Sequence, residues 1–378
     1  MVLVVLCSFT SVVARGQFKL NSKSESLGAD ATRHPGIPDW SARKANYRNP
    51  VSLFSQLDRE LESTIPSIAS FLVWKDSAIV HERYFHDAST VTAFNVKSVT
   101  KSVISAIAGA AYASGYLKNL DTTVIGVLPE YATRGHVTPD VWGYEDVKDA
   151  DSSLHRLTLR DLLTMQAGFE FGDNTGPSGV MHYSSDPVRF QLEMPFGDDP
   201  GDTFKYSTGV AHVFGAALAR LVGTDLRTFA DTALFVPCGM TLRGWAKDAV
   251  GRYIGGSEMQ FTARDLLRFG LLYLDSGLVG SRQVLPKDWV AESLAKHAGL
   301  NKWDVMSGVD GYGYYWWRRR SHGHEVYCAV GYGGQLVCIV PDLKIVVVTT
   351  CTLGKNNRGR AELPRLHRVV DSLILLGN

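Results

Sequence analysis

One stretch of the chain joins a reactive motif to a buried helix: Ser98-Val-Thr-Lys101-Ser-Val-Ile-Ser-Ala-Ile-Ala-Gly-Ala-Ala-Tyr-Ala-Ser-Gly115. Residues 99–117 are almost uniformly small or apolar, which predicts a helix that is buried on all sides. The i, i+3 spacing places the Ser98 hydroxyl and the Lys101 amine on one face, one turn apart. Burial and the positive end of the helix dipole favour a neutral Lys101 amine, which can accept the proton of Ser98. The stretch therefore predicts an activated serine nucleophile.

The Ser-x-x-Lys motif alone is weak evidence, because Ser41-Ala-Arg-Lys44 and Ser293-Leu-Ala-Lys296 have the same spacing. Both of these copies lie among charged residues, so we expect their lysines to be solvated and protonated. The simpler interpretations of Ser98 and Lys101 are a helix N-cap and a lysine whose amine reaches water. Only its apolar surroundings separate Lys101 from the other two lysines.

Two further segments supply polar groups that could assist an activated serine. Pro200-Gly-Asp-Thr-Phe-Lys-Tyr206-Ser-Thr-Gly209 is a turn that leads into a helix, and its tyrosine can relay protons. In Gly331-Tyr332-Gly333-Gly334-Gln335, glycines at the start of a strand let a substrate approach the backbone. The amides of Ser98 and Gln335 would then form an oxyanion hole. The alternatives are a buried tyrosine with a satisfied hydroxyl and a hairpin turn that needs glycine for positive φ.

The order of predicted elements indicates an α/β (α+β) fold. We expect helices at residues 51–64, 99–117, 158–165, 210–221, 226–234, 262–274, 286–297 and 361–376, and strands at 68–74, 78–85, 312–318, 325–328, 335–340 and 344–351. This order predicts one antiparallel sheet built from both ends of the chain and flanked by helices. The helical middle is then an inserted lobe, and the cleft between the lobes is the expected site.

The N-terminus is an uncharged apolar run that ends in Val-Val-Ala, which passes as a cleavage site although no basic residue precedes it. The run is too short to span a membrane. Export to the periplasm or the medium is the favoured interpretation, and the alternative is a cytoplasmic protein with an apolar leader. The predicted organisation is a possible signal peptide at 1–14, an extended lead-in at 15–45, and one catalytic domain at 46–376 with an α/β lobe (46–122 and 303–376) and a helical lobe (123–302).

Composition excludes several classes of function for these 378 residues. The chain is 45% hydrophobic and 20% charged, as in a packed globular protein, and its net charge of +1 gives no reason to expect binding to nucleic acid or anionic lipid. Its five cysteines show no metal-ligand spacing, so we expect neither structural zinc nor another metal. Cys328 and Cys338 lie symmetrically about Gly333, and a disulfide is possible after export, but two buried thiols are the favoured interpretation.

Together these segments resemble the serine β-lactamase and penicillin-binding-protein fold. Within it they look most like the class C type branch, which holds DD-peptidases, lactamase-like esterases and 6-aminohexanoate-dimer hydrolase. The likeness extends over roughly residues 46–376. Further matching segments are Leu162-Leu-Thr-Met-Gln-Ala-Gly-Phe169, Leu234-Phe-Val-Pro-Cys-Gly-Met240, Gly255-Gly-Ser257 and Thr262-Ala-Arg-Asp-Leu-Leu-Arg-Phe-Gly270.

The resemblance implies a role for each of these residues. Ser98 is acylated, Lys101 is the general base and Tyr206 passes the proton to the leaving group, with no metal or cofactor. The backbone N–H groups of Ser98 and Gln335 bind the oxyanion. Residues 170–183 are expected to shape the pocket, and the residues expected to contact substrate are Ser257, Tyr332, Gly333 and Gly334.

Two departures from the family pattern bear on the substrate. The chain has Tyr206-Ser-Thr208 where the lactamases have Tyr-x-Asn, and Tyr332-Gly-Gly334 where they have Lys-Thr-Gly. These changes remove an amide and a cation that a β-lactam needs, so a β-lactamase is disfavoured. The leading hypothesis is a serine hydrolase of small-molecule esters or unstrained amides. The alternatives are a β-lactamase or DD-peptidase, and a non-catalytic relative that binds a ligand; the presence of Ser98, Lys101 and Tyr206 argues against the latter.

Overall fold

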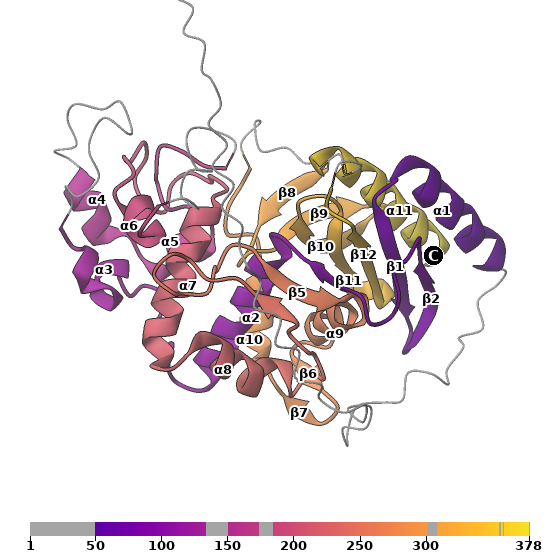
Figure 1. Cartoon of the computed structure of the whole chain (residues 1–378), viewed down its shortest axis with the longest axis horizontal. Helices are drawn as coiled ribbons and strands as arrows, with labels where there is room; N and C mark the ends of the chain where they lie inside the picture. The colour runs from indigo at the N-terminus through magenta and orange to yellow at the C-terminus, as the bar shows by residue number, and fades with distance from the viewer. Residues whose placement is uncertain are drawn as a thin grey trace, which may run out of the picture. The chain divides into compact units, whose positions relative to one another are not determined.

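The computed structural model describes residues 50–133, 150–173, 184–300, 308–354, 357 and 359–377. The expected signal peptide at 1–14 and the lead-in at 15–45 lie outside the described residues. The helices, drawn in Figure 1, are α1 (Pro50–Thr64), α2 (Val99–Ala113), α3 (Val124–Val127), α4 (Ala150–Arg156), α5 (Leu159–Leu163), α6 (Pro187–Leu192), α7 (Thr208–Val222), α8 (Leu226–Ala230), α9 (Ala263–Leu274), α10 (Lys287–Leu294) and α11 (Leu363–Gly377).

The strands are β1 (Ile68–Lys75), β2 (Ala78–Tyr84), β3 (Ala93–Asn95), β4 (Gly244–Trp245), β5 (Met259–Thr262), β6 (Leu278–Val279), β7 (Arg282–Gln283), β8 (Val309–Tyr312), β9 (Trp317–Ser321), β10 (His324–Gly331), β11 (Gln335–Val340) and β12 (Ile345–Cys351). Short 3-10 helices lie at η1 (Pro129–Tyr131), η5 (Pro341–Leu343) and η6 (Gly359–Glu362), and a π-helical turn at η4 (Asp231–Phe235).

A seven-stranded sheet contains segments from both ends of the chain, in the order β2-β1-β12-β11-β10-β9-β8. Strand β1 lies between β2 and β12, with Leu72 opposite Glu82 on one side and Val348 on the other. Every pair of neighbouring strands in the sheet runs antiparallel. The predicted antiparallel sheet, built from the first and last parts of the sequence, is confirmed.

Helices cover both faces of this sheet, which explains the unbroken apolar run in β12. Val347 packs in a core with side chains of α1 and α11, whereas Val346 and Val348 pack in a second core with α2 and α9. Side chains alternate between the two faces of a strand, so both faces of β12 must be apolar. Figure 1 shows α1 and α11 together beside the sheet.

Helix α2 is buried over almost its whole length, as its composition predicts. Residues Val99–Ala111 are all buried, and only the end of the helix is exposed. Gly109 allows a close approach, because a Cβ there would lie 2.5 Å from the indole of Trp289 on α10. Helix α9 lies inside the range predicted for the helical lobe, yet Gly270 brings it against Val346 of the sheet.

The strand predicted at residues 312–318 is wrong, because β8 ends at Tyr312 and β9 begins at Trp317. Tyr315 has φ +62°, and its carbonyl accepts a hydrogen bond from Ser102 Oγ at 2.6 Å. Tyr315 and Trp316 are buried in this turn. Aromatic residues are common in strands, but these two side chains fill the core that contains α2.

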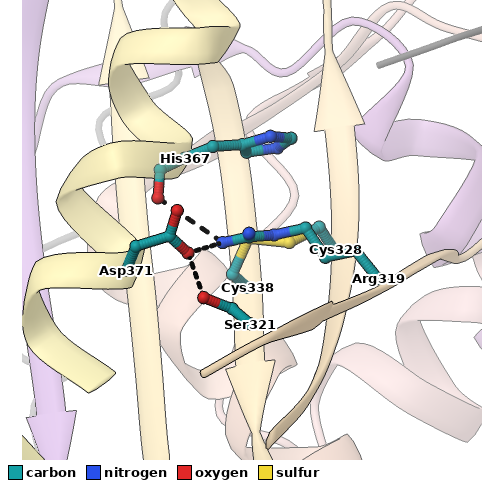
Figure 2. Close-up of a disulfide and its surroundings, with 6 residues drawn as sticks. All are labelled: Arg319, Ser321, Cys328, Cys338, His367 and Asp371. Atoms are coloured by element: carbon teal, nitrogen blue, oxygen red, sulfur yellow. Dashed lines mark hydrogen bonds and ion pairs between the residues drawn. A yellow bond between two sulfur atoms is a disulfide. The ribbon is translucent and has the colours of Figure 1, made fainter. Parts of the chain in front are cut away.

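The preference for two free thiols at Cys328 and Cys338 is also wrong. These residues lie opposite one another on β10 and β11, with Cα atoms 4.2 Å apart, and form a disulfide. Directly opposed residues of antiparallel strands bring their side chains together on one face of the sheet. Figure 2 shows the disulfide beside the contact between Arg319 of β9 and Asp371 of α11, whose Nη2 and Oδ1 atoms are 2.6 Å apart.

Among the described helices, none is long and apolar enough to cross a membrane.

Candidate active site

Ser98 stands at the N-cap position of α2, but its side chain makes no capping hydrogen bond. The residue before it, Lys97, has φ +48°, a conformation that needs support from its surroundings. Lys97 Nζ binds Glu258 Oε1 at 2.8 Å, and Asn95 Nδ2 donates to Glu258 Oε2 at 2.6 Å. This clamp holds the start of α2 against the segment that leads into β5. Because the Ser98 hydroxyl makes no capping bond to the backbone of α2, it is left to side-chain partners.

Lys101 brings three segments of the chain together. Its side chain is buried, with 1% of the residue exposed. Nζ lies 3.0 Å from Ser98 Oγ, 2.9 Å from Thr208 Oγ1 and 2.8 Å from the carbonyl oxygen of Gly256. The amine therefore does not extend into water, and the one-turn spacing predicted for the pair is observed.

The Gly256 carbonyl reaches Lys101 because two glycines lie against the start of α7. A Cβ at Gly256 would lie 2.6 Å from the carbonyl oxygen of Thr208. The preceding residue, Gly255, donates its N–H to His212 Nδ1 at 3.2 Å, and His212 is a buried residue of α7. The glycine pair thus sets where the carbonyl points, and no residue with a side chain fits there without movement.

Tyr206 lies just before α7 and faces both members of the Ser-x-x-Lys pair. The Lys101 amine lies 4.8 Å from the centre of its ring, and the Ser98 side chain acts to lower the pKa of the phenol. The ring stacks on Trp317, with centroids 5.3 Å apart. Burial raises the pKa of Tyr206 well above its usual value, and the Asp173 carboxylate raises it further, so the phenol keeps its proton at neutral pH.

Asp173 was not singled out by the sequence analysis. It lies in the loop that follows α5, and its Oδ1 accepts the Thr208 N–H at 2.7 Å. Its Oδ2 accepts the Thr208 hydroxyl at 2.6 Å. One carboxylate therefore holds both polar groups of the first residue of α7, and the helix dipole favours its negative charge there.

The charges around Lys101 act in opposite directions. Burial lowers the pKa of Lys101 from 10.5 to about 8. The Asp173 carboxylate raises this pKa, and the guanidinium of Arg360, an exposed residue of η6, lowers it. A large share of the amine is therefore neutral near pH 8, as a general base requires.

The glycine turn between β10 and β11 is explained by close contacts within the protein. Gly333 and Gly334 have φ +82° and +96°. A Cβ would lie 2.7 Å from Asn357 Nδ2 at Gly333 and 2.5 Å from Cys351 Sγ at Gly334. The Gln335 side chain is buried and donates to the Cys351 carbonyl at 2.7 Å. These contacts within the protein are enough to require glycine at both positions of the turn. Contact of Gly333, Gly334 and Gln335 with substrate stays a prediction.

Ser257 and Tyr332 are the two other residues expected to contact substrate. Ser257 is buried, and its side chain helps to lower the pKa of Glu258 of the clamp. Tyr332 is 56% exposed, and a Cβ on Gly359 of η6 would lie 2.5 Å from its hydroxyl. The substrate contacts of both residues stay predictions.

The second Ser-x-x-Lys motif has no comparable geometry. Ser293 Oγ donates to the Trp289 carbonyl at 2.7 Å, and Lys296 is exposed, as expected for a solvated lysine. The third copy, Ser41 to Lys44, lies outside the described residues. Among the described residues, no group of three or more His, Cys, Asp and Glu side chains is placed to hold a metal ion.

Comparison with known proteins identifies the family of the chain. The sequence model of the Beta-lactamase family matches residues 55–372. The chain belongs to the Beta-lactamase family. The predicted resemblance is therefore confirmed over nearly the whole span for which it was expected. No curated protein gives a match to the sequence.

Solved structures share the fold of this Beta-lactamase family member at low sequence identity. A protein assigned as a 6-aminohexanoate-dimer hydrolase from Bacillus anthracis is 19% identical, with a TM-score of 0.65 over 90% of this chain and 88% of its own. EstCE1, a hydrolase with promiscuous acyltransferase activity, is 18% identical, with a TM-score of 0.67 over 85% and 98%. A penicillin-binding-protein homologue from Caulobacter crescentus is 15% identical, with a TM-score of 0.64 over 88% and 99%. At these identities the likeness concerns the fold alone.

Three groups that act on the Lys101 amine were not predicted from the sequence: the Asp173 carboxylate, the Gly256 carbonyl and the Arg360 guanidinium. Gly256 belongs to a segment already matched to the family, but a sequence does not reveal which way a carbonyl points. Asp173 lies in the loop expected to shape the pocket. Arg360 had no signal in the sequence that separated it from other surface arginines.

Proposed function

We propose that this Beta-lactamase family member is a serine hydrolase that cleaves small-molecule carboxylic esters or unstrained amides through an acyl-enzyme on Ser98. One observation carries the proposal. The buried Lys101 amine, whose pKa is lowered to about 8, lies 3.0 Å from Ser98 Oγ. An amine whose pKa lies this close to neutral pH is partly neutral there, and beside a hydroxyl it can act as a general base.

Each proton transfer in the proposed reaction has a named donor and acceptor. Lys101 Nζ takes the proton of Ser98 Oγ as that oxygen attacks the carbonyl carbon of the substrate. The carbonyl oxygen becomes an oxyanion, for which the backbone N–H groups of Ser98 and Gln335 are the proposed donors. The bond to the leaving group then breaks, and Tyr206 protonates the departing oxygen or nitrogen. The Lys101 ammonium restores the Tyr206 proton, and water releases the acid by the same transfers.

The environment of Thr208 supports an ester or linear amide as substrate. Thr208 replaces the lactamase asparagine, and its hydroxyl hydrogen-bonds to both Asp173 and Lys101. We therefore do not expect this hydroxyl to bind the side chain of a β-lactam. The lactamase lysine is replaced by the uncharged Tyr332. An aryl ester needs only acylation and the oxyanion donors, and it tolerates both changes.

The disulfide supports the proposal that the protein acts in the periplasm or outside the cell. Cys328 and Cys338 are bonded, and disulfides persist mainly in oxidising compartments. This agrees with the export favoured by the apolar N-terminal run.

Labelling and mutagenesis test the proposed nucleophile. A fluorophosphonate ester should add once to the wild-type protein, on Ser98, as read by intact mass and peptide mapping. Ser98→Ala should lose the adduct and all turnover while unfolding at nearly the same denaturant concentration, because Ser98 makes no capping bond. Ser293→Ala is the matched control and should keep the adduct. An adduct on Ser293 or none on Ser98 would overturn the proposal.

A comparison of substrates tests the proposed class. Short-chain p-nitrophenyl esters, a linear amide such as a 6-aminohexanoate dimer, and a penicillin are offered to the same preparation. Esters should be cleaved fastest, because each charge-assisted contact that a β-lactam loses costs about tenfold to a hundredfold. Faster hydrolysis of penicillin would favour the lactamase alternative, and no turnover of any substrate would favour a ligand-binding relative.

A further inference from the structure

The partners of the Lys101 amine differ in which hydrogen bonds they can make. The carbonyl of Gly256 can only accept. The Thr208 hydroxyl could in principle donate or accept, but its Oγ1 lies 2.6 Å from Asp173 Oδ2, and an ionised carboxylate can only accept. The Thr208 proton is therefore committed to Asp173. Thr208 Oγ1 must then accept from Lys101, which lies 2.9 Å away.

A neutral lysine amine has two N–H donors and one free electron pair. The two donors of Lys101 are taken by Gly256 at 2.8 Å and by Thr208 at 2.9 Å. Its third polar neighbour is Ser98 Oγ at 3.0 Å. The free electron pair is thus left facing the hydroxyl whose proton it has to accept.

We propose that Asp173 is a positioning residue for the general base: by taking the proton of the Thr208 hydroxyl, its carboxylate makes the free electron pair of Lys101 face Ser98. The inference rests on the proposed function, in which Lys101 is the base for Ser98. Asp173 does not touch the reacting atoms, because one hydroxyl separates its carboxylate from the amine.

Asp173 also acts on Lys101 through its charge. In the described part of the chain, the ionisable groups that act on or contact the amine are Asp173 from the loop after α5, Tyr206 from the segment before α7, and Arg360 from η6. Tyr206 keeps its proton, so the two charges are those of Asp173, which favours the protonated amine, and Arg360, which opposes it. Removing the Asp173 charge should therefore lower the pKa of Lys101, and at the same time the free electron pair of Lys101 should face Ser98 less often.

Asp173→Asn separates these effects with almost no change in size. An asparagine can accept the Thr208 N–H through its oxygen while its NH2 group donates to Thr208 Oγ1. The Thr208 proton then turns toward Lys101 and competes with Ser98 for the electron pair. We expect the rate of Ser98 modification by a fluorophosphonate to fall about tenfold on the high-pH plateau. The acid limb of the pH profile should move down by about one unit, so that the rate below pH 7 hardly changes.

Substitutions at Thr208 test the same contact from the other side. Thr208→Ser keeps the hydroxyl and should keep the rate, whereas Thr208→Val should lower the plateau about tenfold. In a Thr208→Val background, Asp173→Asn should lower the plateau little further, because the hydroxyl through which Asp173 acts on Lys101 is already absent. Asp202→Asn, at an exposed carboxylate, is the matched control and should leave the profile unchanged.

The outcomes distinguish this inference from the proposed function. An unlabelled wild-type Ser98 overturns both. A labelled wild type with an unchanged Asp173→Asn profile overturns only the positioning role. Equal, fully additive losses in the two single variants, with no shift of the acid limb, would mean that Asp173 is merely structural and would also overturn it. The positioning role is supported if the acid limb of the Asp173→Asn profile shifts and the plateau losses of Asp173→Asn and Thr208→Val are not additive. If Asp173→Asn fails to fold, the contrast of Thr208→Ser with Thr208→Val decides.

Discussion

The lowered pKa of Lys101 leads to a quantitative prediction about pH. With a pKa of about 8, the neutral fraction of the amine is about 1% at pH 6 and about 90% at pH 9. If the neutral amine is the base for Ser98, the rate of Ser98 modification should rise about ninetyfold between these pH values and then level off. A lysine with the ordinary pKa of about 10.4 would instead give a rate that still rises about sevenfold between pH 9 and pH 10.

The assay follows fluorophosphonate addition by intact mass at timed intervals, so that product release does not contribute. Ser98→Ala supplies the blank at each pH, and hydrolysis of the free reagent is measured in parallel. The expected profile has unit slope in log rate below pH 8 and is flat above pH 9. A rate that keeps rising to pH 10 would show that burial does not lower the pKa of Lys101. A rate that is flat throughout would show that Lys101 is not the base.

Three further predictions test other parts of the structure. Lys101→Arg should lower the rate at least about a hundredfold at every pH, since arginine keeps the charge but cannot give up its proton; substantial activity would make Lys101 only structural. Arg360→Gln should move the acid limb to higher pH by a few tenths of a unit, because the guanidinium lowers the pKa of Lys101 but is exposed to screening; a downward shift would contradict this. Replacing both Cys328 and Cys338 by serine should lower the free energy of unfolding in urea by about 2 to 3 kcal/mol, and an unchanged midpoint would mean that the disulfide adds no stability.

Local patterns in the sequence were enough to predict most of the architecture. The apolar run after Lys101 leaves a helix no polar face, so burial of α2 on all sides followed from composition. The apolar run of β12 required cover on both faces, and α1, α9 and α11 supply it. The predicted strand at 312–318 failed because aromatic residues suit a strand and a buried turn equally well. In the structure, the Ser102 hydroxyl donates to the Tyr315 carbonyl within the turn, a contact that no local pattern records.

Sequence by itself determined which residues we propose as nucleophile and base, because Ser98 and Lys101 are one helical turn apart and share one local environment. It also placed Tyr206 at the start of a helix and Cys328 opposite Cys338. Only the tertiary structure decided what surrounds the Lys101 amine. Thr208 and Gly256 reach it from more than a hundred residues away, and Asp173 acts through Thr208. Such contacts depend on how helices and loops pack in three dimensions, and no periodicity along the chain records the direction of a carbonyl or the partner of a hydroxyl proton.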